Sequence, residues 1–132
     1  MRRKTAAVIL GVLLAAGTIL AQTPSSGSTL TVAGIGVGTG VSDRELVGQA
    51  ESFPAGVGQV TCLTRLDGAA GESAVTHVWS LGDKEMRRVE LPLRSKSWRT
   101  WSQKNVKPGT WTVRVLDPAG VEIGKVSFTV GP

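Results

Sequence analysis

Apolar and polar residues alternate along most of the chain from position 60 onward, and turn-forming residues separate the alternating runs. Alternation with a period of two places successive side chains on opposite faces of a β-strand. The runs that predict strands are Val60–Leu66, Val75–Leu81, Val89–Leu93, Lys96–Gln103, Trp111–Val115 and Val121–Val130. With a weaker strand ahead of them, about seven short strands predict an all-β fold, an antiparallel β-sandwich of the immunoglobulin-like class.

Two details of the pattern predict features within the sheets. Pro92 lies on the outer face of its strand and has no N–H to donate, so this strand is expected at a sheet edge. In the last strand the apolar positions change phase between Ile123 and Val126, which predicts a β-bulge at Gly124. Trp79 and Trp111 share faces with apolar neighbours and are expected in the core.

Glycines alternate with mostly apolar residues in the stretch Thr31–Val41. The G-x-G-x-x-G spacing of a dinucleotide-binding loop is absent, because the last glycine is missing. The stretch therefore predicts a weak first strand, whose glycines allow close backbone approach or bulging. The next segment, Ser42–Ala50, is expected to form one or two helical turns, capped by Ser42 or Asp43.

The N-terminal residues 1–21 have the layout of a secretory signal peptide. Three basic residues, Arg2 to Lys4, precede an almost unbroken apolar run that ends in the small residue Ala21. The same run is about the shortest that spans a bilayer, so an uncleaved anchor is the alternative. Residues 22–30 read as a flexible Ser/Gly/Pro-rich linker, and residues 31–132 as the β-sandwich domain. Export to the periplasm or cell surface is the expected localisation.

Charge is distributed unevenly along the mature chain. The formal net charge of +5 includes the three basic residues at the N-terminus. Residues 22–85 carry three basic and seven acidic residues, a balance of −4, whereas residues 86–132 carry nine basic and three acidic residues, a balance of +6. The basic half is a candidate surface for an anionic partner, with a merely solvated basic face as the alternative. Predicted export argues against nucleic acid as that partner.

The residues that most often carry chemistry are few. Cys62 is the single cysteine, so no disulfide forms within the chain, and it is expected to behave as a small buried hydrophobic residue. His77 is the single histidine and alternates with apolar residues, which favours a core histidine with satisfied ring nitrogens over a ligand contact. A catalytic arrangement of His77 with Ser73 or Ser80 lacks a nucleophile motif. No metal-ligand cluster is present, and no metal or other cofactor is expected.

Tryptophan is the stronger signal, in the string Trp98-Arg99-Thr100-Trp101-Ser102-Gln103-Lys104. In a regular strand Trp98 points to one face, while Arg99, Trp101 and Gln103 point to the other. Trp98 is therefore expected in the core and Trp101 outside. There the ring either stacks on Arg99 through a cation–π contact or forms a platform for a sugar or peptide.

The strings W-R-T-W-S and G-T-W-T-V, with His77-Val78-Trp79 before them and Val126–Val130 after them, resemble the bacterial family catalogued as domain of unknown function 2914. The resemblance covers roughly Val57–Val130. It implies a small domain of exported or membrane-anchored envelope proteins, and it brings no activity and no catalytic residue with it.

These observations predict a non-catalytic binding or structural module of the cell envelope, with no catalytic residues. The expected partner is an envelope protein or an anionic glycan, contacted through a basic, Trp-containing face. The residues expected to form that face are Trp101, Arg99, Gln103, Arg94, Lys96 and Lys104. The alternatives are an enzyme acting on an envelope polymer and a purely structural spacer.

Overall fold

The computed structural model describes residues 30–70 and 73–132. The predicted signal peptide, 1–21, and all but Leu30 of the predicted linker lie outside the described residues. Within the described part, no helix has the length and apolar character that crossing a membrane requires.

The described residues form ten strands and one 3-10 turn, Ala55–Val57. The strands are β2 (Thr31–Gly38), β3 (Gly40–Ser42), β4 (Glu45–Val47), β5 (Ser52–Phe53), β6 (Gln59–Asp67), β7 (Ser73–Leu81), β8 (Lys84–Leu93), β9 (Ser97–Asn105), β10 (Gly109–Leu116) and β11 (Glu122–Val130). The six strands predicted from position 60 onward are confirmed as β6 to β11. The total exceeds the expected number because three short strands, β3 to β5, follow the glycine-rich strand.

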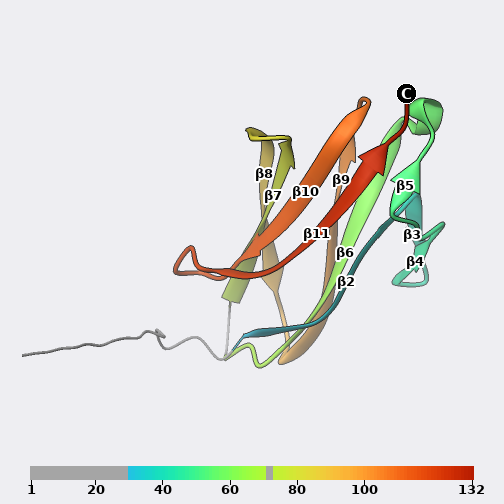
Figure 1. Ribbon diagram of the computed structural model, residues 1–132. Helices are drawn as coiled ribbons and strands as arrows, with labels where there is room; N and C mark the ends of the chain where they lie inside the picture. The colour runs from blue at the N-terminus through green and yellow to red at the C-terminus, as the bar shows by residue number, and fades with distance from the viewer. Residues whose placement is uncertain (1–29, 71–72) are drawn as a thin grey trace, which may run out of the picture.

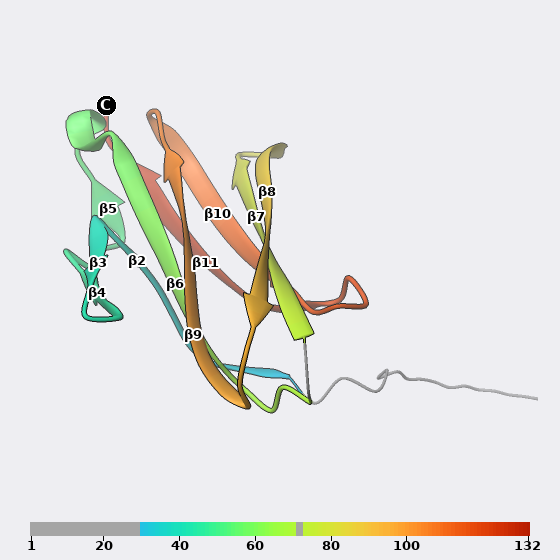
Figure 2. The same cartoon turned by 180° about the vertical axis from the view of Figure 1, so that it is seen from behind.

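Two sheets pack against each other (Figure 1). The large sheet has the strand order β5-β11-β10-β7-β8, and the small sheet has the order β2-β6-β9. From behind, β6 and β9 of the small sheet lie in front of β10 and β11 (Figure 2). All pairings within the sheets are antiparallel except that of β5 with β11, which is parallel.

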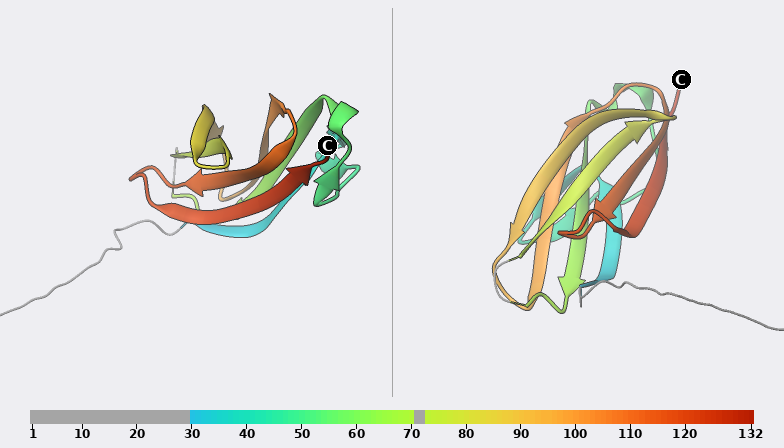
Figure 3. Two further views of the ribbon diagram at one scale, coloured as in Figure 1. Left: turned by 45° about the horizontal axis from the view of Figure 1, so that its top comes forward. Right: turned by 90° about the vertical axis from the view of Figure 1, so that its left-hand side faces the viewer.

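The order in which the chain visits the two sheets is that of an immunoglobulin-like sandwich. Apart from the two-residue strand β5, which comes between β2 and β6 in the chain and joins the edge of the large sheet, the chain runs through β2 and β6 of the small sheet, crosses to β7 and β8, returns for β9, and ends in β10 and β11 of the large sheet. The strands of both sheets follow the long axis of the domain (Figure 3). The predicted fold class is therefore confirmed.

The core between the sheets consists of the inward residues of the alternating runs. Trp79, Trp111 and Val113 of the large sheet are fully buried, as are Val60 and Cys62 of the small sheet. The ring of Phe128 stacks on Trp111 with centroids 6.2 Å apart and meets Trp79 edge-on. A second cluster, which includes Leu66, Val75 and Val115, fills the other end of the sandwich.

The expected edge strand and bulge are also present. Strand β8, which contains Pro92, is the last strand of the large sheet. The register of β10 with β11 changes where Val115 faces Gly124 and Leu116 faces Glu122, so that Ile123 is the extra residue.

The expected helical turns at Ser42–Ala50 are wrong. Strands β3 and β4 form a hairpin there, and its turn residues, Asp43 and Arg44, have φ angles of 52° and 64°. Left-handed backbone at both central residues gives a tight hairpin turn whose twist matches the flanking strands, which is incompatible with a right-handed helix.

The glycines of β2 explain why this hairpin lies where it does. A Cβ at Gly36 would lie 3.1 Å from Cδ2 of Leu46, and one at Gly38 would meet the backbone oxygen of Val47. The hairpin therefore packs directly on the backbone of β2. The close approach and the bulge expected of these glycines are both confirmed, since the β2–β6 register shifts between Val32 and Gly34.

Candidate functional site

Strand β9 divides its side chains between the two faces of the small sheet. Trp98, Thr100 and Ser102 pair with inward residues of β6, and Trp98 packs against the second core cluster. The residues between them pair with the outward residues of β6: Arg99 with Arg65, Trp101 with Leu63 and Gln103 with Thr61. The expected assignment of Trp98 to the core side and Trp101 to the outer side is confirmed, although both side chains are half-buried.

On the inner face, β9 contributes to a buried polar network with His77 at its centre. His77 Nε2 lies 2.9 Å from Thr64 Oγ1, and His77 Nδ1 lies 2.7 Å from Ser102 Oγ. Ser102 Oγ also accepts a hydrogen bond from Trp79 Nε1 at 3.0 Å. His77 comes from the large sheet and both hydroxyls from the small sheet, so the network connects the two sheets.

A histidine bonded to a serine is also the arrangement of an acyl-transfer site, but this pair is enclosed. His77 is 0% and Ser102 7% exposed, and the remaining histidine nitrogen meets a threonine hydroxyl instead of a carboxylate. Burial lowers the pKa of His77 to about 4, so the ring is neutral at physiological pH. The prediction of a core histidine with satisfied nitrogens is confirmed, and its partners are Thr64 and Ser102.

The thiol of Cys62 is similarly isolated. It is fully buried, and burial raises its pKa to about 12. Since the thiolate is the reactive form, this cysteine is inert in the folded protein, and its expected role as a small buried hydrophobic residue is confirmed.

On the outer face of the small sheet, cations gather at the end of β9 that lies near the hairpin tip. Arg99 and Arg65 are directly opposite each other across β9 and β6. Arg99 Nη1 donates to the backbone oxygen of Arg44 at 3.1 Å and lies 4.0 Å from Glu45 Oε2. The Arg99 side chain thus connects β9 to the hairpin turn.

These residues surround a hollow of about 320 Å³, which we call the arginine hollow. Its lining combines the outward residues Arg65, Asp67, Ser97 and Arg99 and the hairpin residue Arg44 with the inward pair Leu66 and Trp98. The size lies at the lower end of the range for small-ligand sites. Its lining carries three cations and one carboxylate.

The cation–π contact between Arg99 and Trp101, one of the two alternatives predicted for Trp101, is not formed. Within residues 30–70 and 73–132, the two contacts of this kind are Arg44 with Trp98, at 5.1 Å from the ring centroid, and Lys104 with Trp111, at 5.8 Å. The guanidinium of Arg99 is instead directed to the hairpin. Trp101 is half-buried and lies opposite Leu63.

The other basic residues of the predicted face lie elsewhere. Arg94 and Lys96 are exposed in the connection between β8 and β9, where they line a separate hollow of about 750 Å³. Lys104 is opposite the inward residue Val60, at the far end of β9, and donates to the Asn105 oxygen at 2.8 Å. The predicted residues thus do not form one continuous patch; Arg99, Trp101 and Gln103 share the outer face.

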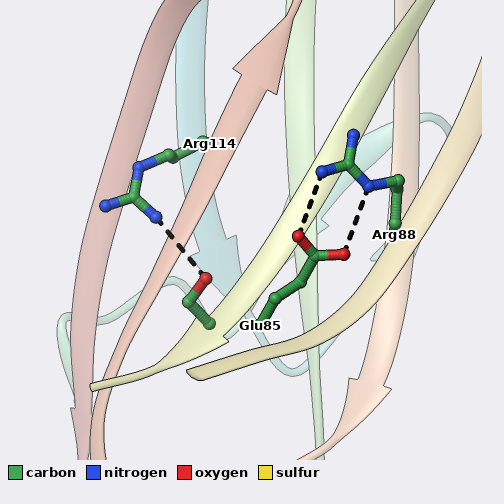
Figure 4. A network of polar contacts seen from close by, with 4 residues as sticks. Glu85, Arg88 and Arg114 are labelled. Carbon is green, nitrogen blue, oxygen red and sulfur yellow. Dashed lines mark hydrogen bonds and ion pairs between the residues drawn. The ribbon is translucent and has the colours of Figure 1, made fainter. Parts of the chain in front are cut away.

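The outer face of the large sheet also carries arginines, but these have partners (Figure 4). Arg88 forms a two-bond pair with Glu85, at 3.0 and 3.2 Å, which lowers the pKa of the Glu85 carboxyl. Arg114 Nε lies 3.3 Å from Glu122 Oε1, and Arg114 Nη1 donates a hydrogen bond to Ser80 Oγ at 3.4 Å. Both arginines are cross-strand neighbours of Val78, which is only 6% exposed, and the apolar stems of such long side chains are able to cover a neighbour of this kind.

Sequence reasoning did not assign Arg44 and Arg65 to the site. Both belong to residues 22–85, whose net charge is negative, so the net charge of that half gave no sign of a basic site. The alternation of β6 does place Arg65 on its outer face, which was a usable signal. The pairing of Arg65 with Arg99 depends on strand register, which the pattern does not specify.

Within residues 30–70 and 73–132 there is no group of three or more His, Cys, Asp or Glu residues that could hold a metal ion.

Residues 72–130 match the model of a family described as Protein of unknown function (DUF2914). The match confirms the family resemblance, over a segment that runs to the end of β11 and begins later than the expected Val57. It contains Arg99 and Trp101, whereas Arg44 and Arg65 lie ahead of it. No curated protein matches the chain.

Proposed function

We propose that this chain is a non-catalytic binding module of the bacterial cell envelope. It contacts an anionic glycan or a protein partner through the outer face of the small sheet. The observation that carries the proposal is the position of Trp101, half-buried on one face with Arg99 and Gln103. Arg65 extends this face across the neighbouring strand.

The chemistry of this face suits a polar polymer that has apolar surfaces. A partly exposed indole ring packs against the C–H face of a sugar or against a peptide side chain. Arg99 and Gln103 beside it offer N–H donors, and the arginines give the face a positive potential that attracts anions.

The burial of the reactive groups favours binding over catalysis. The Ser102–His77 pair and the Cys62 thiol lie in the core and cannot meet a polymer without unfolding the sandwich. Export is part of the proposal through the predicted signal peptide.

The proposal is tested by co-sedimentation of the purified protein with isolated cell-wall material. We expect saturable binding that weakens as salt is raised, because exposed charges are screened. Trp101→Ala is expected to abolish most of the binding. The matched control is Val121→Ala, which removes an exposed apolar side chain, 53% accessible, beside the large sheet. Unchanged binding of Trp101→Ala rejects the platform, and absence of binding by the unaltered protein favours a structural spacer.

A further inference from the structure

We infer that the arginine hollow is a binding site for a single oxyanion group, a carboxylate or a phosphate, carried on a sugar of the envelope polymer. The inference rests on the proposed binding function and adds a ligand chemistry to it. It uses residues other than Trp101, so the two can fail separately.

Arg65 supplies the least compensated charge of the hollow. Its guanidinium makes no ion pair and no hydrogen bond among the described residues. Its side chain lies alongside Gly34 of β2, where a Cβ would be in ordinary contact with it, 3.6 Å from Arg65 Nη1. Like charges directly opposite each other destabilise a sheet, and Arg65 is opposite Arg99. An anion bound between them would remove this repulsion.

Arg99 is fixed by the hairpin without being neutralised by it. Its Nη1 atom donates to the carbonyl of Arg44, and its nearest carboxylate oxygen, on Glu45, is 4.0 Å away on a side chain that is 76% exposed. A pair at this distance and exposure contributes little. A guanidinium has five N–H donors in a planar fork, so most donors of Arg99 remain for a ligand.

Arg44 is held against an aromatic ring at the rim of the hollow. Its guanidinium carbon lies 5.1 Å from the centroid of Trp98. The contact orients the cation while leaving its N–H groups at the edge, where an oxyanion accepts them. The half-buried ring of Trp98 adds an apolar wall, which suits a sugar that carries the anionic group.

The hollow also contains a carboxylate, and this restricts the ligand. Asp67 lines it, with Oδ1 accepting a hydrogen bond from Ser97 Oγ at 2.7 Å. An anion bound beside Asp67 is repelled by it, whereas a cation or an ammonium group would be attracted. Removing the charge of Asp67 should therefore raise the affinity for an anionic ligand and lower the affinity for a cationic one.

The experiment is a titration of the full chain with glucuronate and with glucose 6-phosphate, with glucose as the uncharged reference. Indole N–H resonances of the four tryptophans report the binding, because Trp98 lines the hollow. We expect saturable binding of at least one charged sugar and none of glucose. Binding of glucuronate identifies a carboxylate-bearing polymer as the source, and binding of glucose 6-phosphate a phosphate-bearing one.

Three variants separate the site from general charge attraction. Arg65→Gln is expected to weaken binding about fivefold, the change that ~1 kcal/mol produces. Asp67→Asn is expected to tighten it about twofold or more, because like-charge repulsion is removed. Arg88→Gln is the matched control, since it removes the same charge from the opposite outer face.

The inference is overturned if neither charged sugar binds, if Arg65→Gln and Arg88→Gln weaken binding equally, or if Asp67→Asn weakens it. Trp101→Ala keeps the binding of the small charged sugar if the hollow is a separate site. If Trp101→Ala loses cell-wall binding and Arg65→Gln keeps it, the hollow does not bind the polymer. That result overturns the claim that the oxyanion is carried on the envelope polymer. Loss in Arg65→Gln alone rejects the Trp101 platform and retains the hollow.

Discussion

On the outer face of the large sheet, Arg88 and Arg114 each meet a carboxylate, whereas on the outer face of the small sheet Arg65 meets none among the described residues. Arg99 has only a loose contact with an exposed glutamate. The presence or absence of a carboxylate partner indicates that arginine has different roles on the two outer faces. Paired arginines flank the buried Val78 on the large sheet, whereas Arg65 on the small sheet has no carboxylate partner among the described residues, and the proposed ligand site rests on this difference.

The largest expected effect is a loss of stability of the whole sandwich, and it results from protonation of His77 in the core between the two sheets. Burial lowers the pKa of His77 from 6.5 to about 4. Between these values the unfolded chain binds a proton that the folded chain does not, so the free energy of unfolding falls as pH is lowered from 6.5 toward 4, by roughly 3 kcal/mol. Urea unfolding across this range measures it. His77→Gln is expected to flatten the slope, and an unchanged slope contradicts the assignment.

The next largest effect is expected from displacing the β3–β4 hairpin, which changes the outer face of the small sheet and leaves the large sheet intact. A Cβ at Gly38 would meet the backbone oxygen of Val47, whereas one at Gly40 has open space. Gly38→Ala is therefore expected to lower the free energy of unfolding by about 1–3 kcal/mol, as overpacking does, and to weaken cell-wall binding by moving Arg44. Gly40→Ala is the control. Equal stability of the two variants would show that the hairpin is not seated on β2.

A smaller effect compares the two faces of one strand, β6. Thr64 bonds to His77 on the inner face, so Thr64→Val is expected to lower the free energy of unfolding by about 1–2 kcal/mol. Thr61 Oγ1, on the outer face, is buried without a hydrogen-bond partner among the described residues. Thr61→Val is therefore expected to leave stability unchanged or raise it by up to ~1 kcal/mol. Denaturant unfolding of both variants checks the difference, and a clear loss in Thr61→Val would be the opposing result.

The smallest effect compares the arginines themselves by thermal unfolding. Arg88→Gln breaks a paired interaction and is expected to lower Tm slightly. Arg65→Gln removes repulsion with Arg99 and is expected to leave Tm unchanged or raise it. The contrast fails if Arg65→Gln lowers Tm more than Arg88→Gln, because Arg65 would then have a structural role.

Much of the sandwich could be predicted from local pattern. Alternation specified β6 to β11, the proline specified an edge strand, and the phase change specified the bulge at Gly124, because each signal acts within one strand. The hairpin was missed because Ser42–Ala50 has helix-compatible residues, and its conformation depends on left-handed φ angles at Asp43 and Arg44. The hairpin conformation is stabilised by packing on the glycines of β2. This is a tertiary contact, which the local sequence pattern does not reveal.

The site was predictable only in part for the same reason. Alternation correctly separated Trp98 from Trp101 and put Arg99 and Gln103 with Trp101. The register that sets Arg65 opposite Arg99, and the hairpin that brings Arg44 to Trp98, join segments far apart in sequence. The partner of His77 was missed on the same ground, since Ser102 is 25 residues away.

The central claim is that the outer face of the small sheet is the binding surface, and the indole N–H resonances test it most directly. Trp79 and Trp111 are 0% exposed, whereas Trp98 and Trp101 are half-buried at the small sheet. Addition of soluble cell-wall fragments to the labelled protein is predicted to shift or broaden the resonances of Trp98 and Trp101 and to leave those of Trp79 and Trp111 in place. Binding that perturbs backbone resonances of β8 and β10 while all four indole resonances stay fixed would contradict the claim.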